Sequence, residues 1–283
     1  MTKVVFDKLR MGKPTLGIIE MTPSPELVEL CGYVGFDYVL IDRMVTSVDW
    51  VRASEMVRAA DAFNIASIIR AEADPWRPGG NSGLATELTR ALSIGADGIC
   101  MSIASTDDLN TAMEVAKDWH RRIYITRFSS SDSFRNAERD AVANTIVMPL
   151  VESQGAIEGL EGFFAMKPTA VFLGMGDISR LVGDPGNVEH PGVWEIIDRA
   201  AALAREHNVV LAVNTGRQFR TPRDMVARTE RLLERGVTSI IFQHTTQLLQ
   251  YFCEDLLADV RNLVDQAPRD TTALQSCRLR SDK

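Results

Sequence analysis

The chain has few cysteines, and they do not cluster. Cys31, Cys100, Cys253 and Cys277 are scattered, with no CxxC pair and no histidine at ligand spacing. Disulfide scaffolds and zinc sites both need cysteines, or cysteines and histidines, at short and regular spacing. The sequence therefore favours reduced, mostly buried thiols and excludes both kinds of site.

The chain also lacks a long hydrophobic run and an excess of basic residues. No stretch approaches the ~20 apolar residues of a membrane span, and the first residues lack the apolar run of a signal peptide. With 38 acidic and 31 basic residues, the formal charge is -7, whereas a nucleic-acid binder needs a basic face. We expect a cytoplasmic protein that binds neither membrane nor nucleic acid.

What is present is a regular alternation of short apolar runs and segments with helical periodicity, across 283 residues. The runs are almost continuously apolar, which is typical of parallel strands buried on both faces. The eight expected strands are Thr15–Met21, Asp37–Asp42, Ala66–Glu72, Gly98–Met101, Ile146–Glu152, Ala170–Gly174, Val209–Asn214 and Thr238–Gln243.

Eight such units without a break in composition predict a single-domain (β/α)8 TIM barrel, an α/β fold of roughly 250 residues. We expect the barrel and a C-terminal helix, about Thr245–Val264, to span residues 1–266, followed by a polar, disordered tail over 267–283. A Rossmann-like open sheet is the second possibility. It is weaker because no GxGxxG motif opens the first βα turn.

Two features refine this expectation. Ser24-Pro25 and Thr221-Pro222 are typical helix starts, and the first helix should bury one face, made of Leu27, Leu30, Cys31 and Val34. Irregular segments at 74–83 and 128–144 follow strands, with an extra short strand at Ile123–Arg127 outside the barrel. They are either tolerated insertions or parts that shape the site.

Polar residues stand at or just after the ends of several expected strands, and in a barrel these ends meet at one mouth. Glu152 and Asp177 are hard oxygen ligands suited to Mg²⁺ or Mn²⁺. Two protein ligands leave positions for water and a bidentate 2-oxo acid, whose oxygen the metal would polarise. Arg70 would add a fixed positive group beside that oxygen.

Each of these assignments has a structural alternative. A carboxylate at a strand end can cap a helix or join a salt bridge, and Arg70 can neutralise Glu72 or Asp42. We interpret Glu20 as structural.

His244 ends the eighth strand and is either a general base or a structural histidine. The other histidines, His120, His190 and His207, are expected at the surface. Arg43 and Arg127 could bind a second carboxylate of the substrate or form ordinary salt bridges.

Several segments resemble the HpcH/HpaI family of class II, metal-dependent pyruvate aldolases, which includes macrophomate synthase-like enzymes. The resemblance covers about residues 12–260, and the matching segments follow one another in the same order as in the family. Its segments are Gly35-Phe-Asp-Tyr-Val-Leu-Ile-Asp42, Ile69-Arg70, Gly95-Ala-Asp-Gly-Ile99, Pro149-Leu-Val-Glu152-Ser-Gln-Gly-Ala-Ile157, Val171-Phe-Leu-Gly-Met-Gly-Asp177-Ile-Ser179 and Gly183-Asp-Pro-Gly186.

The resemblance implies roles for individual residues. Glu152 and Asp177 match the family's metal ligands, and Arg70 matches its enolate-stabilising arginine. Gly176 and Asp177 match the backbone that receives the substrate carboxylate. Asp42 matches the acidic half of an Asp–His dyad.

The sequence departs from the family where the proton shuttle should be. After Asp42 the family has Gly-Glu-His, whereas this chain reads Arg43-Met44-Val45, and Leu150 replaces a glutamine. The Arg-Gly loop expected before the fifth strand is replaced by a serine-rich segment. General acid–base help is worth about 10²–10⁴ in rate, so its loss predicts an altered reaction or a substitute base such as His244.

The sequence thus predicts a divalent-metal-dependent carbon–carbon lyase or aldolase acting on a small 2-oxo acid through a pyruvate-type enolate held by the metal. One alternative is a decarboxylase or bond-forming enzyme that uses the enolate without the histidine. Another is a non-catalytic barrel that binds metal and oxo acid. The resemblance also implies a homo-oligomer, a trimer or hexamer.

Overall fold

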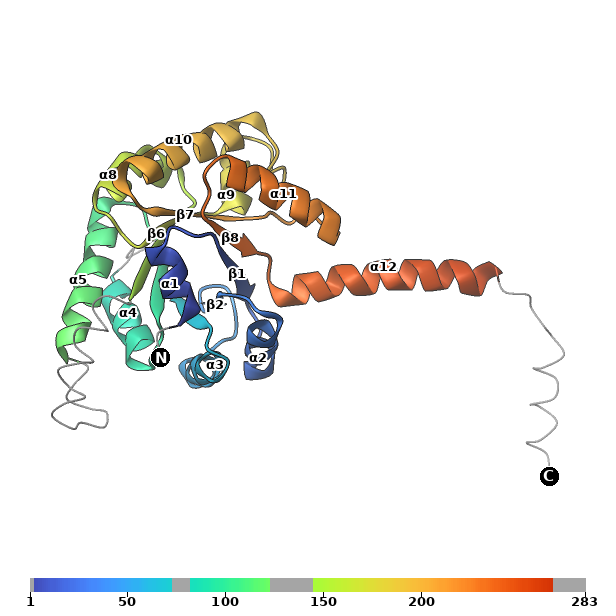
Figure 1. Cartoon of the computed structure of the whole chain (residues 1–283), viewed down its shortest axis with the longest axis horizontal. Helices are drawn as coiled ribbons and strands as arrows, with labels where there is room; N and C mark the ends of the chain where they lie inside the picture. The colour runs from blue at the N-terminus through green and yellow to red at the C-terminus, as the bar shows by residue number, and fades with distance from the viewer. Residues whose placement is uncertain (1–2, 73–81, 123–144, 267–283) are drawn as a thin grey trace, which may run out of the picture. The chain divides into compact units, whose positions relative to one another are not determined.

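The computed structural model describes residues 3–72, 82–122 and 145–266. The expected strand Ile123–Arg127, the tail 267–283 and most of both irregular segments lie outside these ranges. Eight parallel strands close into a barrel in the order β1 to β8 (Figure 1). They are β1 Thr15–Glu20, β2 Tyr38–Asp42, β3 Ala66–Arg70, β4 Gly98–Ser102, β5 Ile146–Val151, β6 Ala170–Leu173, β7 Val210–Asn214 and β8 Ser239–Phe242.

Within Met1–Thr246, helices follow the strands and surround the barrel, so the (β/α)8 prediction is confirmed, with strand ends that differ by one or two residues. The described helices are α1 Val4–Arg10, α2 Pro25–Val34, α3 Trp50–Ala62, α4 Leu84–Ser93, α5 Thr106–Arg122, α7 Gln154–Glu158, α8 Leu160–Ala165, α9 Met175–Leu181, α10 Pro191–His207, α11 Pro222–Glu234 and α12 Thr245–Gln266.

Helix α2 begins as the sequence predicts but buries a different face. The Ser24 hydroxyl accepts a hydrogen bond from the Leu27 amide, and proline occupies the first turn. The expected inward face was wrong in part, because Leu30 and Val34 are exposed, whereas Val28 and Cys31 are buried. An apolar stripe on both sides of a helix does not indicate which side meets the barrel.

Alternate residues of the strands point into the barrel and pack in layers, as period-two strands require. The interior cluster also includes Val5 and Phe6 of α1, which precedes the first strand and packs into the same core. Its strand residues are Tyr38, Leu40, Ala66, Ile68, Cys100, Ile146, Met148, Leu150, Ala170, Phe172, Ala212 and Ile241. The interior is therefore filled up to the carboxyl ends of the strands.

By internal contacts the chain divides into Met1–Thr246, which contains the barrel, and Gln247–Lys283. The domain boundaries expected from the sequence stay a prediction. Helix α12 carries exposed apolar residues, namely Leu249, Phe252, Leu256, Leu257, Val260, Leu263 and Val264. Among the described residues, no helix has the length and apolar character needed to cross a membrane.

Candidate active site

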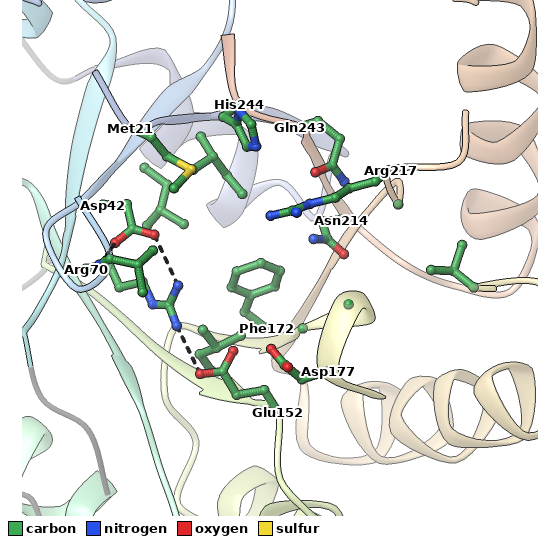
Figure 2. Close-up of a pocket in the computed structure, with 18 of the residues that line it drawn as sticks. Met21, Asp42, Arg70, Glu152, Phe172, Asp177, Asn214, Arg217, Gln243 and His244 are labelled. Carbon is green, nitrogen blue, oxygen red and sulfur yellow. Dashed lines mark hydrogen bonds and ion pairs between the residues drawn. The ribbon is translucent and has the colours of Figure 1, made fainter. Parts of the chain in front are cut away.

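Beyond the core, one more residue faces inward at the end of each strand or directly after it. Together these residues form the barrel mouth. They lie two residues after the uppermost core residue of their strand, so they share its direction. In strand order they are Met21, Asp42, Arg70, Ser102, Glu152, Gly174, Asn214 and Gln243. All except Ser102 line a cavity of about 420 Å³ (Figure 2), at the face where barrels carry their active sites.

Arg70 bridges two carboxylates on either side of it. Its Nη1 donates to Asp42 Oδ2 at 3.1 Å and its Nη2 to Glu152 Oε1 at 2.9 Å (Figure 2). Burial opposes the positive charge, but the two carboxylates outweigh it, so the pKa of Arg70 is raised. The guanidinium is therefore a fixed cation, and its buried Nε has no hydrogen-bond partner among the described residues.

Glu152 is buried, and one of its oxygens is fully engaged. Oε1 accepts from Arg70 and, at 2.5 Å, from the hydroxyl of Ser102. Burial raises the pKa of Glu152, and Arg70 and Ser102 partly offset this effect. Oε2 faces Gly174, where a Cβ would stand 3.2 Å away. A larger residue at position 174 would crowd this oxygen.

Asp177 lies in the first turn of α9, at the edge of the same cavity, and Figure 2 shows its carboxylate facing that of Glu152. Its side chain is 49% exposed, and Arg180 contacts Oδ1 at 3.3 Å. A Cβ at Gly176 would meet no atom within 4 Å, so the backbone there is open. Among the described residues, no histidine, cysteine or further acidic residue lies beside this pair as a third metal ligand.

The donor set fits the divalent metal that the sequence predicts. Both side chains offer hard carboxylate oxygens, the type that Mg²⁺ and Mn²⁺ prefer. Arg70 and Ser102 hold Oε1 of Glu152, which leaves Oε2 as the oxygen available to a ligand. A two-carboxylate site leaves coordination positions for water and substrate.

The resemblance assigns Asp42 to the acidic half of a dyad, but the oxygens of Asp42 are used within the protein. Oδ2 accepts from Arg70, and Oδ1 accepts from the amides of Met44 and Val45 at 2.8 and 3.4 Å. Val45 lines the cavity and is 61% exposed. Asp42 therefore holds Arg70 and the loop after β2, while its expected role in orienting water stays a prediction.

Arg43 does not line the cavity, so its suggested role in binding a second substrate carboxylate is wrong. Its Nη1 pairs with Glu87 of α4 at 2.6 Å, and its guanidinium stacks on Trp50 at 3.6 Å. Glu72 contacts Arg43 at 3.6 Å rather than pairing with Arg70. These contacts fix the loop that carries Val45. The other suggested arginine, Arg127, lies outside the described residues.

His244 lines the cavity and lies at its upper edge in Figure 2. Its Nδ1 lies 3.1 Å from the hydroxyl of Thr246, so the hydroxyl fixes the ring. Burial lowers the pKa of His244, and the charge of Arg217 lowers it further, so the imidazole is neutral near pH 7.

The remaining acid–base residues lie elsewhere. His190 caps α10 by accepting from the Gly192 amide, and His207 lies in the last turn of that helix. The side chain of His120 lies outside the described set. Glu20 is fully buried and accepts from Thr22 and Thr245, in keeping with a structural role.

Four residues of the site escaped the sequence analysis. Ser102, Asn214 and Gln243 are inward residues near strand ends, and alternation from the core could have identified them. Asn214 Oδ1 accepts from the Met175 amide at 3.2 Å, which fixes the start of α9. Arg217 lies in the turn after β7, and no periodicity indicates that its side chain reaches the cavity.

The model of the HpcH/HpaI aldolase/citrate lyase family matches residues 21–244. The chain belongs to this family. Membership confirms the resemblance seen in the sequence and makes a lyase or aldolase activity the expected one.

Three similar proteins give the scale of the likeness. A hydroxypyruvate/pyruvate aldolase of Sagittula stellata is 25% identical over 204 residues, 70% of this chain and 77% of that protein. A 2-dehydro-3,6-dideoxy-6-sulfogluconate aldolase of Pseudomonas putida is 24% identical over 215 residues, 74% of this chain and 80% of that protein. The crystal structure of citrate synthase SbnG superposes with a TM-score of 0.75 at 18% identity, covering 94% of this chain and 100% of that one.

Proposed function

We propose that the protein is a divalent-metal-dependent carbon–carbon lyase or aldolase that acts on a small 2-oxo acid through a pyruvate-type enolate. One observation carries the proposal: a fixed arginine at the barrel mouth donates to one of two facing carboxylates, Glu152 and Asp177. Such a site offers a fixed positive charge that can stabilise an enolate oxygen, and two carboxylates that can hold a metal ion. Family membership and the pyruvate aldolase among the relatives support the same chemistry.

Glu152 and Asp177 would hold the metal, Mg²⁺ or Mn²⁺. When bound, the metal would supply Lewis-acid polarisation of the 2-oxo group. The amides of Gly176 and Asp177 lie in the first turn of α9, where backbone N–H groups have no partner within the helix. They would receive the carboxylate of the substrate.

In cleavage of a 4-hydroxy-2-oxo acid, a base removes the proton of the 4-hydroxyl group, and the bond between C3 and C4 breaks. The electron pair of that bond moves to C3 and the 2-oxo oxygen, which gives the enolate of pyruvate and an aldehyde. Arg70 would stabilise the negative charge on that oxygen from a fixed position, and such a donor acts without reorganising. Protonation of C3 then releases pyruvate.

His244 would serve as the base, because it is the titratable residue of the mouth whose side chain is neutral near pH 7 and oriented by a hydroxyl. Asp42 fits that role less well, since its oxygens already accept from Arg70 and from two amides. Val45 offers no proton acceptor.

A second candidate function follows from the same observation. A decarboxylase or a bond-forming enzyme generates or uses an enolate without taking a proton from a 4-hydroxyl group. The engaged oxygens of Asp42 and the apolar Val45 suit such a reaction. Pyruvate release from oxaloacetate, with none from 4-hydroxy-2-oxo acids, would favour it.

Release of pyruvate from oxaloacetate and from 4-hydroxy-2-oxo acids, measured with added Mg²⁺ or Mn²⁺ and with EDTA, tests the proposal. We expect turnover that stops in EDTA and returns with metal, and a severe loss in Glu152→Ala. Metal-independent turnover, or full activity in that variant, would overturn it. Glu195→Ala is the matched control, because Glu195 is an exposed glutamate of α10 that does not line the cavity.

We also propose that the protein is a homo-oligomer, a trimer or hexamer, because the apolar residues of α12, including Phe252 and Leu256, are exposed in the single chain. Light scattering should report a single oligomer that Phe252→Glu dissociates. A monomeric wild type would exclude it. The cytoplasmic location expected from the sequence stays a prediction.

A further inference from the structure

The side-chain amide of Asn214 has its orientation set by a backbone group. Asn214 is the last residue of β7, and its Oδ1 accepts a hydrogen bond at 3.2 Å from the amide of Met175, the first residue of α9. A backbone N–H group can only donate, so the oxygen of the side-chain amide must face Met175. The nitrogen, Nδ2, must therefore face the other way.

Nδ2 of Asn214 faces the cavity. Asn214 is half-buried and lines the cavity, and Figure 2 shows the nitrogen of its amide turned inward and the oxygen turned away. Among the described residues, no atom accepts a hydrogen bond from Nδ2, and unlike Nε2 of Gln243 it is not a fully buried atom. The protein thus holds a neutral donor in a fixed direction, where a bound molecule can reach it.

Several other donors of the lining are engaged. Arg70 donates to two carboxylates, and Arg180 pairs with Asp177. In the proposed cleavage, Arg70 faces the 2-oxo oxygen, and the amides of Gly176 and Asp177 receive the carboxylate of the substrate. The third oxygen-bearing group of a 4-hydroxy-2-oxo acid, the 4-hydroxyl group, meets a base in this scheme but has no donor assigned to it.

Asn214 lies between the two places where the ends of such a substrate would lie. Strand β7 pairs with β6 on one side and with β8 on the other. Helix α9, with Asp177, follows β6, and His244 follows β8. A molecule whose carboxylate lies at the start of α9 and whose 4-hydroxyl group lies at His244 therefore passes the end of β7, where Nδ2 of Asn214 faces it.

We propose that Asn214 is a catalytic residue whose Nδ2 donates a hydrogen bond to the 4-oxygen of the substrate, the atom that becomes the oxygen of the aldehyde. During cleavage the proton of the 4-hydroxyl group passes to His244, the electron pair of the C3–C4 bond moves into the enolate, and a C4–O double bond forms. Asn214 keeps both of its protons. Its hydrogen bond orients the hydroxyl group and stabilises the charge that develops on the 4-oxygen. The inference rests on the proposed function, because it takes the oxo-acid end to lie at Glu152 and Asp177 and the base to be His244.

The experiment compares two reactions of the same site, of which one needs the 4-oxygen. Cleavage of 4-hydroxy-2-oxobutanoate and 4-hydroxy-2-oxopentanoate requires that oxygen, whereas exchange of the methyl protons of pyruvate for deuterium requires the enolate alone. Both are measured with Mn²⁺, cleavage by pyruvate release and exchange by NMR. The pH is chosen where the cleavage rate no longer changes, so that a shift in the ionisation of His244 does not alter the comparison.

Two substitutions of Asn214 separate its donor from its acceptor. Asn214→Asp keeps an oxygen for the Met175 amide but loses the donor, so the kcat of cleavage should fall about 10²-fold while pyruvate exchange stays near the wild-type rate. Asn214→Leu lacks both groups and should lower both reactions, because the first turn of α9 also loses its acceptor. Asn110→Asp is the matched control, since Asn110 is an exposed residue of α5 that does not line the cavity. It should change neither reaction.

Failure of this inference differs from failure of the proposed function. Equal losses of cleavage and exchange in Asn214→Asp would limit Asn214 to holding α9, and undiminished cleavage would leave its donor without a role. Either result overturns the inference, as does a wild type that exchanges pyruvate protons but cleaves neither hydroxy acid, and in all three cases the metal-dependent enolate site still stands. Absence of Mn²⁺-dependent exchange in the wild type overturns the proposed function and the inference together.

Discussion

Arg70 Nη2 donates to Oε1 of Glu152 at 2.9 Å. This contact joins the two halves of the proposed chemistry, because the cation that would stabilise the enolate also orients a proposed metal ligand. Ser102 completes the arrangement by donating to the same oxygen. A substitution at any one of these three residues should therefore change the position or the hydrogen bonding of the other two.

Replacement of Arg70 should lower both the rate and the stability, and a replacement that keeps the positive charge should lower mainly the rate. Arg70→Met should lower kcat by about 10²–10³ and lower the free energy of unfolding by about 2–3 kcal/mol, since two buried carboxylates lose their partner. Arg70→Lys should recover part of the stability but little of the rate, because an ammonium cannot bridge both carboxylates. Denaturant unfolding and steady-state kinetics measure the two effects, and equal losses of rate in Arg70→Lys and a distant surface variant would contradict the role.

Loss of Ser102 should act through Glu152. In Ser102→Ala the carboxylate loses one of the two donors that hold Oε1, and metal affinity should fall about 10- to 100-fold, as it does when a partner of a metal ligand is removed. Mn²⁺ titration calorimetry measures this. Ser239→Ala is the control, because Ser239 is equally buried and hydrogen-bonded to Tyr38 but lies at the start of β8. An unchanged Mn²⁺ affinity in Ser102→Ala would show that Ser102 does not support metal binding.

The pH profile should reveal the ionisation of His244. A base must be neutral, and burial together with the charge of Arg217 lowers the pKa of His244 below 6.5. The kcat for aldol cleavage should therefore rise with pH through a value below 6.5 and level off near neutrality. Arg217→Met removes a cation, so the rise should move to higher pH.

In His244→Gln the rise should disappear together with most of the activity. A profile that is unchanged in this variant would assign the base elsewhere.

A histidine at position 45 should improve aldol cleavage. Val45 lines the mouth, and its amide already contacts Asp42, so Val45→His would place an imidazole near a carboxylate that can orient it. We expect a gain of up to about 10²-fold in kcat. Val51→His, at an exposed position of α3 outside the cavity, is the matched control. No gain would indicate that this loop, fixed by Arg43, does not direct residue 45 to the substrate.

Most of the barrel could be read from the sequence, because buried parallel strands leave near-continuous apolar runs. The site was only partly predictable. Glu152 and Asp177 stand out as acidic residues after such runs, but Ser102 and Gln243 look like ordinary polar residues until the inward alternation is followed from the core. Arg217 could not be predicted, because its direction depends on how Gly216 packs against Val188, a contact between distant segments.

The most direct test of the central claim is exchange of the methyl protons of pyruvate for deuterium, followed by NMR in D₂O. Exchange requires the enolate but no second substrate, so it does not depend on the unknown distal group. We predict exchange with Mg²⁺ or Mn²⁺, none after EDTA, and none in Glu152→Gln. Exchange that persists without metal or in that variant, or an absence of exchange in the metal-loaded wild type, would contradict the account.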